Sequence, residues 1–401
     1  MWLANCILVD VEDGGASREG SLRIEDGAIV EVADALPRSA DNVVDLQGRF
    51  LSPGLISCHT HFTEVYPFSS ADEDESPAVS SLRALHRAKQ ALWAGVTTVR
   101  CVHEQNRADI WLRLADANGW TRAPRILAAG RAISTTGGHG DYGIGCAIAD
   151  GPEEFFKVAR TELAAGADHI KVFVSGGIAN LENLDAVQMT SDEMRAVVSA
   201  TDMQRSYVVA HAANSASIKL GLEAGIRSFE HAYQLDEETA TRMATQGVFL
   251  TPTLNVTHCI DRMRAVGFEE SQIDRAARAA PMHRRSIETA IHAGVKLVNG
   301  VDGGPGEPID GTSLAVIETE LLADAGLSSQ RALQTATVNA AELLGIGDHV
   351  GTIREGADAD VIAMKRDPLS DVRALRTIDF VMRRGEVVRD EREGRTAPPV
   401  D

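Results

Sequence analysis

The chain has 401 residues, of which 44% are hydrophobic and 24% are charged, a composition typical of a folded globular protein. Its 39 basic and 58 acidic residues give a net charge of −19, which argues against nucleic acid or an anionic membrane surface as a partner. No apolar run approaches a membrane span, the first residues lack a basic start and a processing site, and the five cysteines are scattered. We therefore predict a cytoplasmic protein with reduced thiols.

The two ends of the chain predict a small β domain. Short apolar segments separated by glycine-containing turns follow one another up to about residue 50, and the same pattern returns from Gly351. Because chain termini often lie close together, we predict one β-sandwich domain formed by residues 1–51 and 347–401. Its predicted strands are Asn5–Val9, Ser21–Ile24, Ile29–Val32, Val43–Asp45, Val361–Met364 and Phe380–Arg383, with a further strand at Val387 and Val388.

The middle of the chain, residues 52–346, alternates between helix-like and strand-like segments. Helical stretches end at Ala-Gly or Gln-Gly, and a run of β-branched residues follows at once. Five strands follow this pattern, and Leu55–His61, Arg125–Ala129 and Val208–Ala213 bring the total to eight, which predicts a (β/α)₈ TIM barrel. A doubly wound open sheet is the alternative, but no Gly-x-Gly-x-x-Gly turn follows the first strand. The predicted strands are Leu55–His61, Val96–Val102, Arg125–Ala129, Ile170–Val174, Val208–Ala213, Ile226–Glu230, Val248–Leu254 and Val295–Val301.

Polar side chains gather at the carboxyl ends of these strands, where barrel enzymes carry their chemistry. His59 and His61 lie two residues apart on the first strand, so their side chains share one face. Taken singly, a histidine or an aspartate at a strand end is more often an ordinary hydrogen-bonded or turn residue. Six candidates at equivalent places on five strands, however, indicate a metal site. The other four are Lys171, His211, His231 and Asp302 on the fourth, fifth, sixth and eighth strands.

This ordered set of residues resembles the ligand pattern of the amidohydrolase superfamily. The likeness covers nearly the whole chain: residues 51–56 resemble the family's entry to the first strand, and residues 351–362 resemble its return into the small domain. Residues 137–140 (Gly-Gly-His-Gly) and 229–233 (Phe-Glu-His-Ala-Tyr) resemble the branch related to imidazolonepropionase, which contains metal-dependent prolidases and carboxypeptidases.

The resemblance implies two divalent metal ions as cofactors, and zinc suits the nitrogen and oxygen ligands. Lys171 would be carboxylated by CO₂ and would bridge the two ions as a carbamate. Asp302 would take a proton from the attacking metal-bridging hydroxide and deliver it to the leaving amine. The implied ligands are His59, His61 and Asp302 for one ion, and His211 and His231 for the other.

Three further residues are predicted to bind substrate. By resemblance, His139 in its glycine-rich loop would polarise the scissile carbonyl. Tyr233, two residues after a candidate ligand, would donate to a substrate carboxylate if the strand continues, and Arg131 is a charged partner for the same group. The acidic loop at residues 176–185 argues the other way, because it suits a basic side chain or a neutral amide.

The leading functional hypothesis is a binuclear metal-dependent hydrolase of C–N bonds, similar to an Xaa-Pro dipeptidase (prolidase) or an N-acyl amino acid hydrolase. The alternatives are a hydrolase of another small amide, carbamate or cyclic amide, as in imidazolonepropionase, or a mononuclear deaminase. No glutamate follows His211 closely, and Lys171 is retained, which disfavours the deaminase. A non-enzymatic relative would lose metal ligands, whereas every ligand type is present here. We also expect a homo-oligomer with a small-molecule amide or dipeptide substrate.

Overall fold

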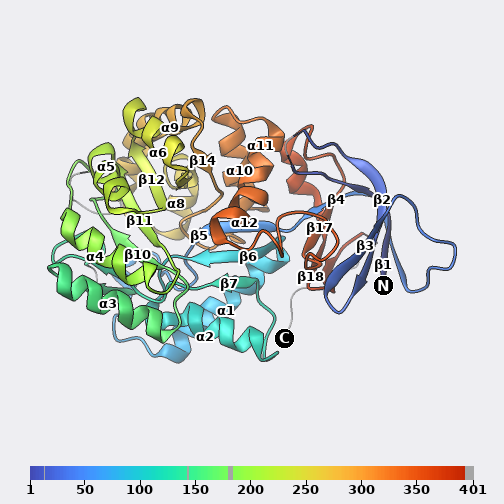
Figure 1. Ribbon diagram of the computed structural model, residues 1–401, viewed down its shortest axis with the longest axis horizontal. Helices are drawn as coiled ribbons and strands as arrows, with labels where there is room; N and C mark the ends of the chain where they lie inside the picture. The colour runs from blue at the N-terminus through green and yellow to red at the C-terminus, as the bar shows by residue number, and fades with distance from the viewer. Residues whose placement is uncertain (13, 142–143, 179–183, 393–401) are drawn as a thin grey trace. The chain divides into compact units, whose positions relative to one another are not determined.

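The computed structural model describes residues 1–12, 14–141, 144–178 and 184–392 (Figure 1). The chain forms two compact units. The first comprises Met1–Ser57, Arg87–Val99 and Pro305–Asp401, and the second comprises Cys58–His86 and Arg100–Gly304. Within the described ranges, no helix combines the length and the apolar character needed to cross a membrane.

The first unit contains a seven-stranded sheet built from both ends of the chain, in the order β19-β18-β17-β4-β1-β2-β3. Strands β1 and β4 pair in parallel, and the remaining neighbours are antiparallel. The prediction that the two β-rich ends come together in one structure is therefore confirmed, while its arrangement as a sandwich domain stays a prediction. The strands are β1 (Trp2–Leu8), β2 (Arg18–Glu25), β3 (Ala28–Ala33), β4 (Val43–Pro53), β17 (Val361–Met364), β18 (Ile378–Arg383) and β19 (Glu386–Asp390).

One apolar core stabilises this sheet. Leu3, Leu22, Leu51 and Phe380 are fully buried in it, and each such side chain contributes roughly 1.5–3 kcal/mol relative to an exposed position. The unit also contains three helices, a short hairpin and a 3₁₀ turn: α10 (Leu314–Asp324), α11 (Ser329–Thr335), α12 (Val338–Leu344), β15 (Pro308–Ile309), β16 (Thr312–Ser313) and η3 (Val372–Thr377).

The middle of the chain alternates strands with helices, as the sequence pattern predicts. Its strands form two runs, β5-β6-β7 and β14-β13-β12-β11-β10-β8-β9, and the neighbours from β8 to β14 pair in parallel. Each of the eight predicted strands overlaps one of them, whereas β8 and β9 were not predicted. The strands are β5 (Leu55–Thr60), β6 (Val96–Cys101), β7 (Arg125–Leu127), β8 (Ala132–Ser134), β9 (Cys146–Ile148), β10 (Ile170–Phe173), β11 (Val208–Asn214), β12 (Ser228–Gln234), β13 (Phe249–Thr251) and β14 (Lys296–Leu297).

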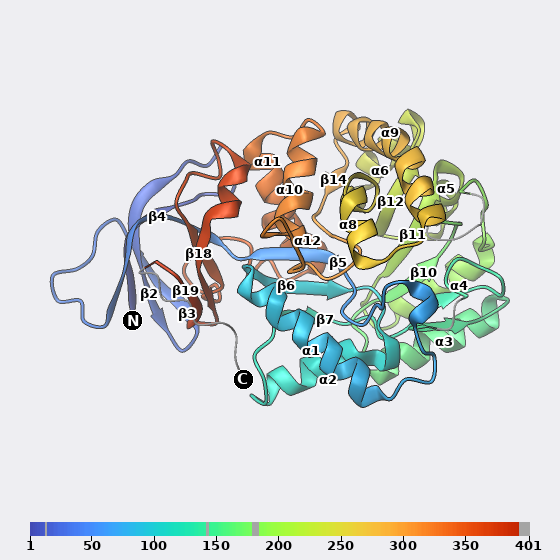
Figure 2. The same cartoon turned by 180° about the vertical axis from the view of Figure 1, so that it is seen from behind.

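Helices α3, α4 and α5 lie on the outer side of β10 and β11, which both views show (Figures 1 and 2). Helix α4 begins with a capping box, in which the Glu193 amide donates to Thr190 Oγ1 and the Thr190 amide donates to Glu193 Oε2. Helix α3 ends at Gly166 with a φ of 112°, a left-handed conformation that glycine adopts without steric cost. The helices are α1 (Pro77–Trp93), α2 (Ala108–Ala117), α3 (Pro152–Ala165), α4 (Ser191–Asp202), α5 (Ser215–Ala224), α6 (Glu237–Gln246), α7 (Asn255–His258), α8 (Ile260–Val266), α9 (Glu270–Ala293) and the 3₁₀ turns η1 (Phe68–Ser70) and η2 (Gln105–Arg107).

The segment after β14 runs beside β5. The amide of Cys58 donates to the Asn299 carbonyl at 2.7 Å, and the amide of Val301 donates to the His59 carbonyl at 3.0 Å. Gly300 makes this approach possible, since a Cβ there would lie 2.6 Å from the Cβ of His59. The prediction of an α/β fold is thus confirmed, and closure of all eight strands into a barrel stays a prediction.

Candidate metal centre

Three side chains converge at the carboxyl ends of β5 and of the segment after β14. Nε2 of His59 lies 3.0 Å from Oδ1 of Asp302, and Nε2 of His61 lies 3.1 Å from the same oxygen. Their ligand atoms all fall within 4.8 Å of one another. Two imidazole nitrogens and a carboxylate oxygen that face one point are held together either by a shared proton or by a cation, and these ligand types fit a divalent metal ion.

The backbone holds Asp302 in place. Its φ of 52° is left-handed, a conformation that aspartate tolerates better than most residues, and its amide donates to the His59 carbonyl at 3.0 Å. The Asp302 side chain is 25% exposed, whereas those of His59 and His61 are buried. The group is therefore closed on the histidine side and accessible on the aspartate side.

Each of these two histidines has its second ring nitrogen fixed by a partner. Nδ1 of His61 donates to the His103 carbonyl at 3.0 Å, and Nδ1 of His59 donates to Oε2 of Glu230 at 2.7 Å. Nε2 of both rings is therefore directed at Asp302. Burial lowers the pKa of His61, but the Glu64 and Asp302 carboxylates outweigh burial and raise it to about 9. The negative potential that holds this proton also attracts a metal cation.

The second group of predicted ligands lies beside the first. The His231 ring centroid is 5.0 Å from that of His59 and 4.6 Å from that of His211. Nδ1 of His231 bonds to Thr253 Oγ1 at 2.7 Å, which leaves Nε2 available. Nε2 of His211 donates to the Gly176 carbonyl at 3.1 Å, which leaves Nδ1 available. His231 has a φ of 70°, so the strand departs from regular alternation at this ligand.

Lys171 on β10 is 1% exposed, and burial lowers the pKa of its amine to about 8. Its Nζ lies 5.5 Å from the Phe173 ring centroid, and none of the hydrogen bonds between described residues involves it. A buried ammonium without a hydrogen-bond partner is unfavourable. Conversion of the amine to an anionic carbamate would remove that charge, and a lowered pKa increases the neutral fraction that can react with CO₂. This side chain therefore fits the implied bridging ligand.

A buried ion pair beside His59 was not predicted from the sequence. Arg100 on β6 and Glu230 on β12 are both fully buried, and NH2 of Arg100 lies 2.9 Å from Oε1 of Glu230. Burial raises the pKa of Glu230, but Arg100 and the hydrogen bond from His59 outweigh it and hold that pKa well below its usual range. The sequence offered one clue to this pair: an arginine and a glutamate, which carry opposite charges, each lie inside a predicted strand.

His139 lies beside the second group of ligands. Its ring stacks on that of His211 with a centroid separation of 4.4 Å and an interplanar angle of 28°. A Cβ at Gly177 would lie 2.3 Å from Nε2 of His139, so only glycine leaves room for this ring. The structure thus brings His139 together with the predicted ligands.

Tyr233 and Arg131 have different surroundings. The Tyr233 ring lies parallel to that of His231 at 5.4 Å, but it is 1% exposed and belongs to an apolar cluster with Ile178 and Met263. Burial raises the pKa of its phenol well above the usual range. The roles of Tyr233 and Arg131 in binding a substrate carboxylate stay predictions.

The guanidinium of Arg131 donates to Oε1 of Glu162 at 2.8 and 3.0 Å, and Arg107 bonds to the other oxygen of that carboxylate. Arg131 is therefore held at α3 by a shared ion pair. Residues 179–183 of the acidic loop predicted at 176–185 lie outside the described residues.

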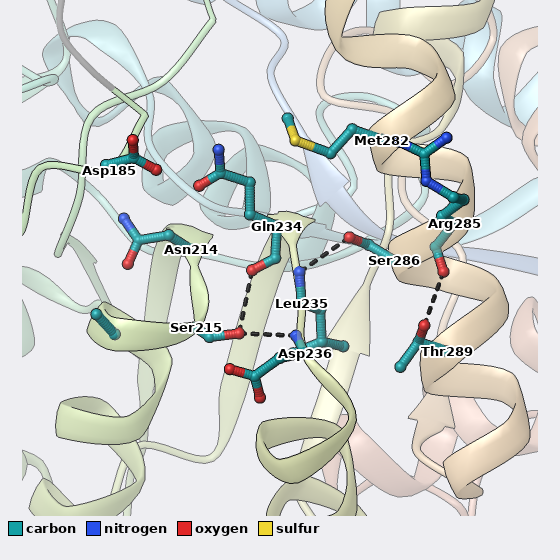
Figure 3. A pocket seen from close by; sticks show the side chains of 11 residues that line it. Asp185, Asn214, Ser215, Gln234, Leu235, Asp236, Met282, Arg285, Ser286 and Thr289 are labelled. Atoms are coloured by element: carbon teal, nitrogen blue, oxygen red, sulfur yellow. Dashed lines mark hydrogen bonds between the residues drawn. The ribbon is translucent and has the colours of Figure 1, made fainter.

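A cavity of about 480 Å³ opens where β11 and β12 end (Figure 3). Ser286 on α9 accepts from the Leu235 amide and donates to the Tyr233 carbonyl, at 2.9 and 2.8 Å. Ser215 bonds to the backbone on the far side of the same turn. These bonds fix the end of β12, the strand that carries His231. The cavity is lined by Asp185, Asn214, Ser215, Ala216, Gln234, Leu235, Asp236, Met282, Arg285, Ser286 and Thr289.

The α/β fold and the His-His-Asp group are consistent with a metal-binding protein, and comparison with known proteins gives its family. The Amidohydrolase family matches residues 50–388, so the chain belongs to the amidohydrolase family. The chain is 29% identical over 358 residues to the ochratoxinase of Aspergillus niger, covering 81% of this chain and 72% of that protein. It is 26% identical over 408 residues to an imidazolonepropionase of Mesorhizobium japonicum, covering 89% and 90%.

A solved structure is also similar to this chain. The crystal structure of a Xaa-Pro dipeptidase with bound methionine in the active site has a TM-score of 0.86 and 30% identity, covering 96% of this chain and 98% of that one. The resemblance to the amidohydrolase superfamily and to its imidazolonepropionase- and prolidase-related branch is confirmed. Members of this family are hydrolases that act on C–N bonds and generally depend on metal ions, in agreement with the His-His-Asp group.

Proposed function

We propose that this protein is a binuclear metal-dependent amidohydrolase that cleaves the amide bond on the N-terminal side of a small carboxylate-bearing residue. Xaa-Pro dipeptides and N-acyl-prolines are the lead substrates. The observation that carries the proposal is the convergence of His59, His61 and Asp302 on one point. The similarity to a Xaa-Pro dipeptidase supports the choice of substrate.

Two zinc ions would complete the site. When bound, such ions polarise the amide carbonyl and lower the pKa of water to near neutrality. Carboxylated Lys171 would bridge them. The proposed ligands are His59, His61 and Asp302 for one ion, and His211 and His231 for the other.

The protein's own side chains would move the proton and hold the substrate. Asp302 is the accessible member of its group, so it would accept the proton of the attacking water and give it to the leaving amine. His139, beside His211, would donate a hydrogen bond to the scissile carbonyl. Tyr233, two residues after His231 on β12, and Arg131 would bind the substrate carboxylate.

The proposal extends to the architecture. Residues 52–346 would form a closed (β/α)₈ barrel, and residues 1–51 with 347–401 would form a β-sandwich domain. A cytoplasmic location and a homo-oligomeric state remain predictions from the sequence.

Two measurements on the purified protein test this function. Metal analysis should find about two equivalents per chain, since one would favour a mononuclear site and none would favour a non-enzymatic protein. The zinc-loaded protein should then be assayed against Xaa-Pro dipeptides, N-acyl amino acids and their carboxamides. Metal without hydrolysis of any free acid in this panel would contradict the proposed substrate class.

The second candidate is a hydrolase of another small-molecule amide or of a cyclic amide. It is favoured by the 29% identity to an ochratoxinase and by the match to an imidazolonepropionase along most of both chains. Adding neutral aryl amides and cyclic amides to the same panel separates the candidates, because they lack the carboxylate next to the scissile bond that the first candidate requires.

A further inference from the structure

The buried pair of Arg100 and Glu230 has no part in the chemistry proposed above. Both side chains are 0% exposed, and they come from strands far apart in the chain. Burying two charges costs solvation free energy that their mutual attraction often fails to recover, so apolar replacements of such pairs are frequently neutral or stabilising. A contribution to stability is thus a weak explanation for this pair.

Both oxygens of the Glu230 carboxylate are fixed. Oε1 accepts from NH2 of Arg100 at 2.9 Å and from Oγ of Ser228 at 2.9 Å. Oε2 accepts from Nδ1 of His59 at 2.7 Å. The guanidinium of Arg100 donates to the Cys58 carbonyl at 2.5 Å and to Thr251 Oγ1 at 3.3 Å. Cys58 directly precedes His59. The pair therefore contacts His59 through its ring and through the backbone just before it.

An ionised carboxylate can only accept hydrogen bonds, so this contact determines which nitrogen of His59 carries the proton. With the proton on Nδ1, the lone pair of Nε2 is directed at Asp302, 3.0 Å away. The other candidate histidine ligands have uncharged partners: the His103 carbonyl for His61, the Gly176 carbonyl for His211 and the Thr253 hydroxyl for His231. A charge-assisted hydrogen bond is about twice as strong as a neutral one, so His59 is the most firmly held of the four.

We propose that Arg100 and Glu230 are positioning residues that hold His59 with its proton on Nδ1 and its Nε2 aimed at the candidate metal centre. Arg100 holds the carboxylate in place, and Glu230 acts on the ring. This inference rests on the proposed function for the identity of the centre, but the hydrogen bond itself can be tested in the metal-free protein.

The key variant is Glu230→Gln. A glutamine has one acceptor oxygen, which can serve Arg100 or His59 but not both, so we expect the affinity for the first metal ion to fall about 10- to 100-fold. Affinity is measured by competition with a chelator. The matched control is Glu162→Gln, at another buried carboxylate that is paired with arginine but contacts no candidate ligand, and its metal affinity should equal that of the wild type.

A double variant, Arg100→Met with Glu230→Leu, separates positioning from stability. Because both charges are removed together, the metal-free protein should keep its thermal midpoint close to that of the wild type, whereas its metal affinity should fall as in the single variant. A double variant with wild-type metal affinity would overturn the proposal and leave amide hydrolysis standing.

Nitrogen-15 NMR of histidine-labelled, metal-free wild-type protein tests the tautomer directly and depends on no variant. We expect a protonated Nδ1 on His59, with a proton signal shifted downfield by the carboxylate. An unprotonated Nδ1 would refute the positioning role whatever the variants do. A protonated Nδ1 in a protein that binds no metal and hydrolyses no amide would instead refute the proposed function and leave the hydrogen bond established.

Discussion

The two halves of the candidate centre differ in how much of their geometry the protein itself provides. His59, His61 and Asp302 contact one another directly, with two nitrogens at 3.0 and 3.1 Å from one oxygen. In the other half, the rings of His211 and His231 lie 4.6 Å apart, and Lys171 has no hydrogen-bond partner among the described residues. The first half is preorganised by the fold alone. In the proposed function, the second half would need the carbamate at Lys171 before its side chains could act together.

Replacing Lys171 should have the largest effect, because the less organised half depends on it. We expect Lys171→Ala to lose most bound metal and to reduce turnover to the background rate. Short carboxylic acids such as formate or propionate should restore part of both, since they can bridge two ions. Metal analysis and initial rates measure this. Lys219→Ala, at a partly exposed lysine paired with Glu238, is the matched control.

Wild-type metal content and turnover in Lys171→Ala would remove the carbamate from the proposed function. They would also show that the two halves are less different than their contacts indicate.

Asp302→Asn tests the preorganised half. Asparagine keeps the shape and the left-handed backbone but cannot accept the proton, so kcat should fall on the order of 10²–10⁴-fold while KM changes little. Steady-state kinetics on the zinc-loaded protein measures the split, and the thermal midpoint of the metal-free protein controls for folding. A loss smaller than about tenfold would mean that Asp302 is a ligand or a turn residue without a role in proton transfer.

The Tyr233→Phe variant tests whether the substrate carboxylate is bound next to His231, in the less organised half of the candidate centre. Loss of a hydrogen bond to a charged group should weaken free-acid substrates by about 10- to 100-fold in kcat/KM. Carboxamide analogues should be poor substrates of the wild type and should change little in the variant. Equal turnover of an acid and its carboxamide by the wild type would exclude carboxylate recognition.

The smallest effect is expected at Thr253, the uncharged partner of His231. Thr253→Val keeps the β-branched shape but removes the hydroxyl, so the affinity for the second ion should fall about tenfold. Thr257→Val is the matched control, since Thr257 is also buried and bonds to His283, which is not a candidate ligand. If Thr253→Val lost more metal affinity than Glu230→Gln, the half with His211 and His231 would be the more preorganised of the two.

Features carried by local sequence were predictable. The eight strands predicted for the middle region each overlap an observed strand, and five of them follow a glycine that ends a helix, whereas the short strands β8 and β9 were missed. Gly166, Gly225, Gly247 and Gly294 have the left-handed φ expected of helix C-caps. The capping box of α4 also follows from local sequence, because Thr190 and Glu193 have the residue types and the spacing that this motif requires. The spacing of His59 and His61 places both on one face of β5, and the structure brings them together.

Features that depend on contacts between distant strands were not predictable. Alternation along β12 places Glu230 and His231 on opposite faces, but the left-handed conformation at His231 changes the direction of the chain there. The partnership of Arg100 with Glu230 needs the register of strands 130 residues apart. Arg131 looked available for a substrate, because nothing in its local sequence indicates Glu162 as its partner.

The cavity at the end of β12 combines side chains that hold the backbone with side chains that only line its wall. Ser215 and Ser286 supply the bonds that end the strand, whereas Gln234, Met282 and Arg285 contribute other parts of the wall (Figure 3). Variation at the latter three positions leaves the strand-ending bonds and every candidate ligand unchanged. Variants at Gln234 and Arg285 would therefore change the polarity and charge of the cavity wall while the bonds that end β12 remain.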